Sequence, residues 1–187
     1  HTKGGLGSIT QKMGDIAEGL GVDIRLNEPV SEFLFEGKKV VGAKTDMGSY
    51  TADRFVMNVD FATGMKGLIP DDLRRKWSDK KLDEKSYSCS TYMLYLGVDK
   101  LYDTPHHQIY AAKDYQKNLK EVTENKVTWD DPSVYVQNAC VTDPSMAPEG
   151  HSTIYVLVPA SSTNPDIVWD DIKHEYMDVI LKQMEKL

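Results

Sequence analysis

The chain has 187 residues, 40% of them hydrophobic, which is enough to fill the core of one large domain or of a domain with an appendage. Its formal net charge of -7 and its pI near 5.2 argue against a surface that binds nucleic acid. The sequence has no apolar run as long as the ~18 residues that cross a bilayer, so it predicts no membrane span and favours a cytoplasmic protein.

The first third of the chain begins with a helical pattern and continues with strand patterns. Apolar residues recur at helical spacing from Leu6 to Leu20, and Gly21 is a suitable stop for this helix. A short strand is predicted at residues 22–26, and a β-meander follows it. The three strands of the meander are expected at residues 30–35, 40–45 and 49–58.

The remainder predicts short helices and then a sheet. Residues 61–84 favour two helical pieces, with Pro70 at the start of the second. Asp114 and the pair Asp170–Asp171 are suited to helix starts. The chain is therefore predicted to be α+β, with a mixed or antiparallel sheet that has its helices on one face. The strands are expected at residues 86–98, 106–112, 133–141 and 152–160, and the helices at 114–124 and 171–187.

The strands of this sheet are apolar on both faces. Met93 and Tyr95 alternate with other apolar residues in one strand, and Tyr155 and Leu157 do so in another. Two apolar faces need two covers, and the helices can supply only one of them. The tyrosines are either ordinary sheet packing or the lining of a large apolar pocket, and the sequence leaves both interpretations open.

Residues with catalytic or metal-binding chemistry do not occur at the spacing that such sites require. His106 and His107 are adjacent on a predicted strand, which would point their side chains to opposite faces. Cys89 and Cys140 are expected to be reduced, half-buried thiols. Asp143 is interpreted as a turn-capping residue. The sequence therefore predicts no metal site and identifies no catalytic residue.

Two loops have more structure than a simple connection needs. The segment GGLG, which begins at Gly4, is either a flexible lead into the first helix or a close approach of the backbone to a ligand at the helix N-terminus. The segment TDPSMAPEG at residues 142–150 joins two predicted strands and is longer than the two to five residues of most hairpin loops. Its stiffness comes from Pro144 and Pro148.

Four segments together resemble the phytoene dehydrogenase-like flavoproteins of the carotenoid-desaturase type. They are GGLGSITQKMGDIAEGLGVDIRLNEPVSEF, VVGAKTDMGSYTADRFVMNVD, STYMLYLGVDKLYD and VTDPSMAPEGHSTIYVLVPA. The last of these is the most specific, whereas the first two are shared with amine-oxidase-like flavoproteins generally. The resemblance implies a FAD-dependent oxidoreductase of carotenoid biosynthesis, in which the flavin takes a hydride equivalent from a carbon–carbon pair of a long apolar isoprenoid.

The resemblance also implies that the chain is the middle of a longer polypeptide. In such proteins a Rossmann-type FAD domain is built from both ends of the chain, and a substrate-binding domain is inserted between them. Residues 1–60 are then a helix and meander that border the FAD domain, and residues 61–187 belong to the substrate-binding domain. The start at His1 and the helical pattern that runs to Leu187 favour the same interpretation. Without a dinucleotide fingerprint, this segment alone is expected to be inactive and not to retain FAD.

Four residues acquire a role through the resemblance alone. The main chain of Val30 is expected to meet the FAD adenine. Gly4 and Gly5 correspond to a glycine pair near the flavin-side pocket. Asn58 lies where the family has the end of a strand that approaches the flavin.

A different class of function is also compatible with the residues. The chain could be a non-enzymatic binding module for an apolar ligand or a protein partner. The second face of the sheet would then be covered by that partner. Within the flavoprotein interpretation, the bound substrate and the rest of the same chain provide the cover, and peripheral membrane contact and a homo-oligomer remain as alternatives.

Overall fold

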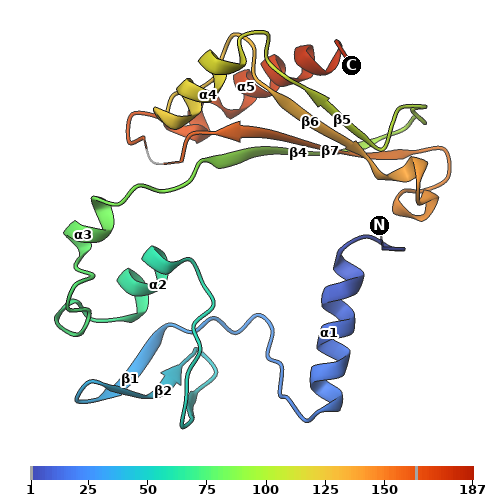
Figure 1. Ribbon diagram of the computed structural model, residues 1–187. Helices are drawn as coiled ribbons and strands as arrows, with labels where there is room; N and C mark the ends of the chain where they lie inside the picture. The colour runs from blue at the N-terminus through green and yellow to red at the C-terminus, as the bar shows by residue number, and fades with distance from the viewer. Residues whose placement is uncertain (1, 163) are drawn as a thin grey trace. The chain divides into compact units, whose positions relative to one another are not determined.

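The computed structural model describes residues 2–162 and 164–187, which form two compact units (Figure 1). The sheet unit consists of His1–Met13 together with Tyr87–Leu187, and the meander unit consists of Gly14–Ser86. This division follows contacts within the chain. The predicted functional division at residue 60 concerns which part borders a FAD domain, and it stays a prediction.

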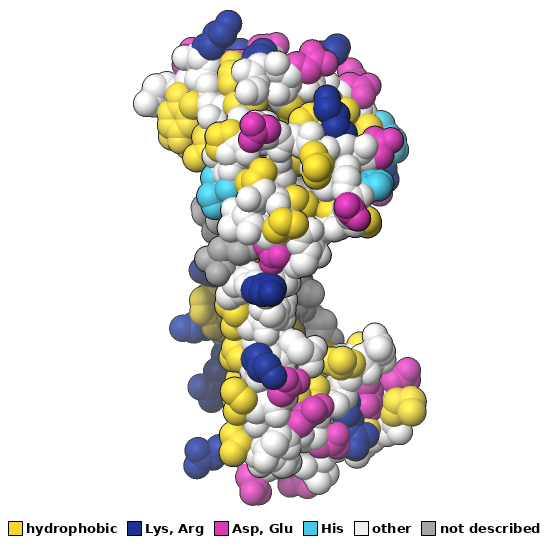
Figure 2. All heavy atoms as spheres, turned by 90° about the vertical axis from the view of Figure 1, so that its right-hand side faces the viewer, with side chains coloured by type: hydrophobic (Ala, Val, Ile, Leu, Met, Phe, Trp, Pro, Cys, Tyr) yellow, Lys and Arg dark blue, Asp and Glu magenta, His cyan; other side chains and the backbone are white. Residues whose placement is uncertain are grey.

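The first helix forms as the apolar spacing predicts. Helix α1 spans Gly7–Gly19, and none of its residues is buried. Its hydrophobic side chains form a column that can be followed along the helix in Figure 2. None of the helices within residues 2–162 and 164–187 has both the length and the apolar character that crossing a bilayer requires.

The meander unit contains the predicted three-stranded antiparallel sheet, in the order β1-β2-β3. The third strand is shorter than predicted, because it pairs with β2 only over three residues and the chain up to residue 58 continues without a partner strand. Gly37, at a φ of 61°, makes the turn between the first two strands. The strands span Glu32–Glu36 (β1), Lys39–Lys44 (β2) and Ser49–Thr51 (β3).

The prediction of a strand at residues 22–26 is wrong. This segment has no regular structure, and none of the described strands pairs with it. Val22 and Leu26 are exposed, so their apolar side chains do not contribute to a core of this unit. An alternating pattern makes a strand only where a neighbouring strand supplies the hydrogen bonds.

Short helices follow the meander, as predicted. Asp60 caps the first of them, because its side chain accepts a hydrogen bond of 2.8 Å from the backbone N–H of Thr63. Pro70 precedes the second helical piece, where its fixed φ is suited to a helix start. The helices span Phe61–Leu68 (α2), Asp71–Leu73 (η1) and Asp79–Asp83 (α3).

The sheet unit is built on four antiparallel strands in the order β4-β7-β6-β5. Helices α4 and α5 lie on the same face of this sheet (Figure 1). The prediction of an α+β fold with helices on one face is confirmed, and the sheet is antiparallel rather than mixed. The elements span Ser90–Val98 (β4), His107–Tyr110 (β5), Tyr115–Thr123 (α4), Val134–Asn138 (β6), Ala139–Val141 (η2), Pro144–Met146 (η3), Ser152–Ala160 (β7) and Trp169–Met184 (α5).

The core lies between the sheet and α5. Tyr176 and Ile180 are one turn apart on α5 and are both buried against the sheet. The hydroxyl of Tyr176 shares a hydrogen bond of 2.7 Å with Thr128, which satisfies the polar end of a buried ring. The core side chains of the sheet are Leu94, Val134, Val136, Ile154, Val156 and Val158.

The two helices of this unit begin differently. Asp114 caps α4 as predicted, since its side chain accepts a hydrogen bond of 2.9 Å from the backbone N–H of Lys117. The predicted capping role of Asp170 and Asp171 is wrong, because Val168 occupies the cap position and both aspartates lie in the first turn of α5. Negative charge in a first turn is still favourable, because the exposed N–H groups of the helix end point toward it.

Candidate functional site

One face of the four-stranded sheet is packed by helices, and the opposite face carries a second set of apolar side chains. Val156 and Val158 of β7 point into the helix-covered core, so strand alternation directs the residues between them to the other side. The register places Met93 opposite Leu157 and Tyr95 opposite Tyr155. We call this second surface the open face. Its residues are Thr91, Met93, Tyr95, His107, Ile109, Tyr135, Gln137, Thr153, Tyr155 and Leu157.

A row of rings crosses the open face from one edge strand to the other. The ring centroids of Tyr95 and Tyr155 lie 5.4 Å apart at an interplanar angle of 73°. Those of Tyr155 and Tyr135 lie 6.1 Å apart at 74°. Tyr135 and His107 are stacked, with centroids 5.9 Å apart. All four strands therefore contribute one ring each, and the edge-to-face geometry of the tyrosines is favourable for aromatic pairs.

The open face is accessible, in contrast to the core. Tyr95 and Ile109 are 73% and 74% exposed, whereas Val156 on the other face is 0% exposed. Tyr135 is half-buried, and burial followed by the nearby Tyr155 raises its pKa, so its hydroxyl stays protonated at neutral pH. The surface is apolar and aromatic with few polar groups, which is the composition of sites for apolar ligands.

The two adjacent histidines lie at the edge formed by β5. His107 Nδ1 and the Tyr135 hydroxyl share a hydrogen bond of 2.7 Å. His106 Nδ1 is 2.5 Å from the Thr142 hydroxyl. Desolvation by burial, followed by the charge of His107, lowers the pKa of His106. The lowered pKa favours a neutral imidazole at His106, beside the edge of this apolar surface.

The prediction that the side chains of His106 and His107 point to opposite faces of a strand is wrong. Their ring centroids lie 4.3 Å apart, because His106 precedes β5 and does not follow the alternation of a strand. Within the described part of the chain, no group of three His, Cys, Asp or Glu side chains is arranged to hold a metal ion. The prediction that the protein needs no metal stays a prediction.

Gly4 and Gly5 form a turn that is held by a distant loop. Both have a φ of 80°, a conformation that side chains other than glycine rarely adopt. The backbone N–H of Gly4 donates a hydrogen bond of 2.8 Å to Oδ2 of Asp143. The other carboxylate oxygen of Asp143 accepts from the backbone N–H and the hydroxyl of Ser145, at 3.1 and 2.6 Å. The capping role predicted for Asp143 is therefore confirmed, and its connection to Gly4 is an addition to it.

This loop, residues 142–150, lies at the end of the sheet. Met146 contacts the Gly4–Gly5 turn, since a Cβ on Gly5 would lie 3.1 Å from the Met146 Cε. The backbone oxygen of Met146 accepts a hydrogen bond of 2.9 Å from the hydroxyl of Thr153, which lies on the open face. Cys140, just before the loop, is buried, whereas Cys89 is exposed, so the two thiols are not both half-buried as expected.

Val30 and Asn58 lie in the meander unit, whereas Gly4 and Gly5 lie in the sheet unit. Val30 precedes β1, is partly exposed, and its main chain makes no recorded hydrogen bond to any described residue. Its N–H and C=O groups are therefore available to a ligand. Asn58 is exposed in the segment between β3 and α2. The roles of these four residues toward a flavin stay predictions.

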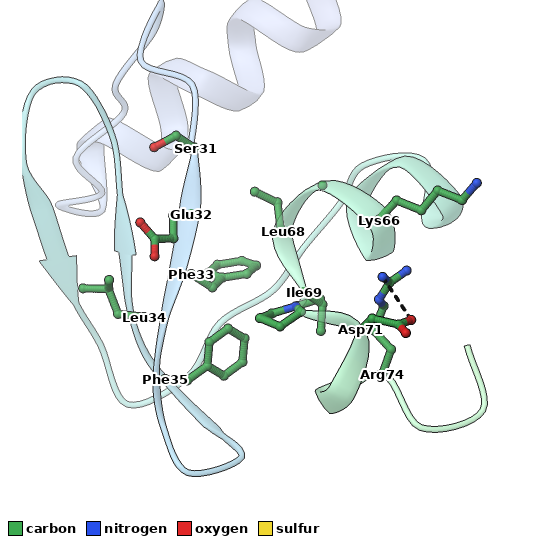
Figure 3. A pocket seen from close by; sticks show the side chains of 12 residues that line it. Ser31, Glu32, Phe33, Leu34, Phe35, Lys66, Leu68, Ile69, Asp71 and Arg74 are labelled. Atoms are coloured by element: carbon green, nitrogen blue, oxygen red, sulfur yellow. Dashed lines mark ion pairs between the residues drawn. The ribbon is translucent and has the colours of Figure 1, made fainter. Parts of the chain in front are cut away.

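The meander unit has a depression of its own, about 560 Å³ in volume, between β1 and the segment that follows α2 (Figure 3). Phe33 and Phe35 point toward Leu68 and Ile69 across it (Figure 3). Arg74, at its rim, pairs with Asp71 at 3.2 Å and with Asp79 at 2.5 Å. Its lining combines apolar side chains with the ion pairs of Arg74, whose Nε is buried without a hydrogen-bond partner among the described residues.

The comparisons with known proteins identify the family. A family model described as flavin containing amine oxidoreductase matches residues 2–187. The 4,4'-diapophytoene desaturase of Methylomonas sp is 38% identical over 185 residues, which cover 96% of this chain and 36% of that protein. The all-trans-zeta-carotene desaturase of Myxococcus xanthus is 36% identical over 192 residues, with 100% and 36% covered. The chain thus spans about a third of the length of these relatives.

A solved structure agrees with the fold. An oxidoreductase from Methanosarcina mazei has a TM-score of 0.63 over 98% of this chain and 39% of its own, at 15% sequence identity. At this identity the likeness concerns the fold alone. Since the family model matches the chain from residue 2 to its end, the chain belongs to the flavin-containing amine oxidoreductases, and the relatives named above are carotenoid desaturases.

Proposed function

We propose that this region binds the substrate of a FAD-dependent oxidoreductase, and that its open face lines the site for a long apolar isoprenoid. The observation that carries the proposal is the row of rings from Tyr95 to His107, which crosses all four strands on the accessible side of the sheet. An enzyme gains nothing in stability from leaving such side chains in water. A ligand that covers them gains about 25 cal/mol for each Å² of apolar surface removed from water.

The shape and chemistry of the open face suit a polyene better than a polar substrate. Its width is set by four strands about 4.8 Å apart, so an extended chain can contact rings from several strands. Met93 and Leu157 add flexible and aliphatic contacts between the rings. Its polar groups are few, and His107 at the β5 edge is hydrogen-bonded to the Tyr135 hydroxyl. Such a surface positions a hydrocarbon and excludes water from it.

FAD is the cofactor of the family, and parts of this chain are suited to contact it through the backbone. The space around Gly4 is open, since a Cβ there would meet no described atom within 4 Å. The N–H and C=O of Val30 have no hydrogen-bond partner among the residues that the structure describes. When bound, the flavin would accept the hydride equivalent from the substrate. We propose that Gly4, Gly5, Val30 and Asn58 lie along this cofactor, while a glycine-rich turn elsewhere in the full-length protein holds the pyrophosphate.

The exposed apolar side of α1 also needs a cover. Met13 in α1 is strongly exposed, and so are Leu6 and Leu20, which flank the two ends of this helix. We propose that the rest of the full-length protein covers them, because the relatives extend well beyond the matched segment. Two other covers are possible for this side of α1. One is a membrane surface, if the protein is cytoplasmic and binds membranes peripherally, and the other is a second copy of the protein in a homo-oligomer. Vesicle flotation and sedimentation of the full-length protein distinguish these covers.

The proposal is tested by a matched pair of tyrosine variants in the full-length protein. The probe is 4,4'-diapophytoene, after which the Methylomonas relative is named. Tyr155→Ala removes the central ring of the open face and is expected to weaken binding of the probe about tenfold, which corresponds to ~1.4 kcal/mol. Tyr115→Ala removes an exposed ring from α4 on the other side and is expected to leave binding unchanged. Equal affinities for the two variants would contradict the proposal.

A further inference from the structure

Asp143 joins two parts of the chain that are 139 residues apart. Its two carboxylate oxygens serve different segments: Oδ2 accepts from the backbone of Gly4, and Oδ1 accepts from Ser145 in its own loop. The residue is only 6% exposed. A nearly buried carboxylate with donors on both oxygens is held in one orientation, because any rotation would leave a buried charge without partners.

The Gly4–Gly5 turn is also fixed by packing. Met146, three residues beyond Asp143, lies so close to Gly5 that a Cβ there would come within 3.1 Å of its Cε. The backbone oxygen of Met146 accepts the hydrogen bond of Thr153 on the open face. Thr153 lies two residues from Tyr155 on β7, on the same face. Contacts therefore join the turn to Thr153, which shares the open face with the row of rings.

We propose that Asp143 is a positioning residue, which fixes the Gly4–Gly5 turn relative to the end of the open face. This inference rests on the proposed function, in which the turn borders the flavin and the open face holds the substrate. Hydride transfer depends steeply on the separation of the reacting atoms, and a misplacement of about 1 Å can cost about a hundredfold in rate. A rigid connection between the cofactor-side turn and the substrate surface sets that separation.

The side chain at this position has to provide two acceptors. Asp143→Ala removes both and releases Gly4 from the loop. Asp143→Asn keeps one acceptor oxygen, which can face Gly4 while the amide group faces the Ser145 hydroxyl. The asparagine variant should therefore recover part of what the alanine variant loses. A residue that only stabilises the fold would not give this order in a rate.

The control is a second carboxylate that joins distant segments without touching the turn. Asp131 accepts hydrogen bonds from Tyr110 at 2.9 Å, from the backbone of Lys113 at 2.7 Å and from Gln183 at 2.6 Å. These contacts lie on the helix-covered side of the sheet. Asp131→Ala should lower the thermal midpoint at least as much as Asp143→Ala. It should leave the turn and the open face unchanged.

The experiment uses the full-length flavoprotein with 4,4'-diapophytoene as the probe. We expect Asp143→Ala to bind the probe within about twofold of the wild type, but to show flavin reduction slowed about tenfold or more. The same variant should show faster hydrogen exchange at the Gly4 and Gly5 amides and a shifted flavin absorbance band. The flavin reduction rate of Asp143→Asn should lie between those of Asp143→Ala and the wild type. Asp131→Ala should show the wild-type reduction rate, amide exchange and flavin absorbance.

The inference is overturned if Asp143→Ala reduces its flavin at the wild-type rate, or if Asp131→Ala slows that rate equally. A wild-type protein that does not bind the probe would contradict the proposed function instead. In that case the amide exchange and the flavin band still decide: unchanged values in Asp143→Ala overturn the positioning role, and altered values in this variant alone support it.

Discussion

The two faces of the β4-β7-β6-β5 sheet both carry apolar side chains, but they differ in solvent exposure. On one face, Val156 and Val158 are buried beneath α5. On the other, Tyr95 and Ile109 remain largely in water. Hydrophobic character alone does not explain the difference, since both faces alternate along the same strands.

The difference between these faces lies in what covers them. Tyr176 and Ile180 give α5 an apolar stripe one turn long that fits the core face. Neither α4 nor α5 reaches the open face (Figure 1). An apolar surface that the chain leaves uncovered indicates a binding surface, whereas an equally apolar surface under a helix is a core.

The largest expected effect separates the faces by stability. Ile180→Ala on the core side should lower the free energy of unfolding by about 2–5 kcal/mol, because it leaves a cavity. Ile109→Ala, the same change on the open face, should alter it by less than about 0.5 kcal/mol. Denaturant unfolding of the full-length protein measures both. Similar losses would show that the open face is core in the intact protein.

A smaller effect is expected at the end of the open face. Gly5→Ala should lower stability by about 1–2 kcal/mol, because its φ of 80° is strained for alanine and Met146 is in contact. Gly7→Ala, at the first residue of α1, has open space and an ordinary φ, and should stabilise the protein by about 0.4–1 kcal/mol. Changes of the same sign in thermal unfolding would contradict this account of the turn.

The smallest effect concerns acid and the helix-covered side. Burial would raise the pKa of Asp131, but hydrogen bonds from Gln183, Lys113, Tyr110 and Lys186 hold it well below its usual range. The unfolded chain then takes up this proton first as the pH falls, so the stabilisation is present above about pH 4 and is lost progressively below it. The thermal midpoint should fall less steeply on acidification in Asp131→Asn than in the wild type. Parallel curves would exclude this role.

Local sequence patterns predicted a strand correctly only where the folded chain also supplies a neighbouring strand to pair with it. The alternation in residues 152–160 was sufficient, because it matches the alternating burial of β7. The helical spacing from Leu6 to Leu20 was sufficient although none of the residues of α1 is buried. The same kind of pattern failed at residues 22–26, where no partner strand exists among the described elements. Pairing is a long-range event, and a window of sequence does not contain it.

The site was predictable in its surface and not in its connections. Alternation alone grouped Met93 with Tyr95 and Tyr155 with Leu157, and the observed register then brings both pairs onto one face. The bond from Gly4 to Asp143 has no local signal, since each residue has a sufficient local explanation, as a helix lead and as a cap. The close approach of the His106 and His107 rings was missed because it depends on where β5 begins, and strand boundaries are the least predictable feature of a sequence.

The central claim is that the open face holds an apolar ligand, and solvent labelling of the full-length protein tests it most directly. Hydroxyl-radical labelling of Tyr95 and Tyr115 is compared with and without 4,4'-diapophytoene, because both rings are exposed and they lie on opposite sides of the sheet unit. The account predicts that the ligand protects Tyr95 and leaves Tyr115 unchanged. Unchanged labelling of Tyr95 by a saturating ligand would contradict it.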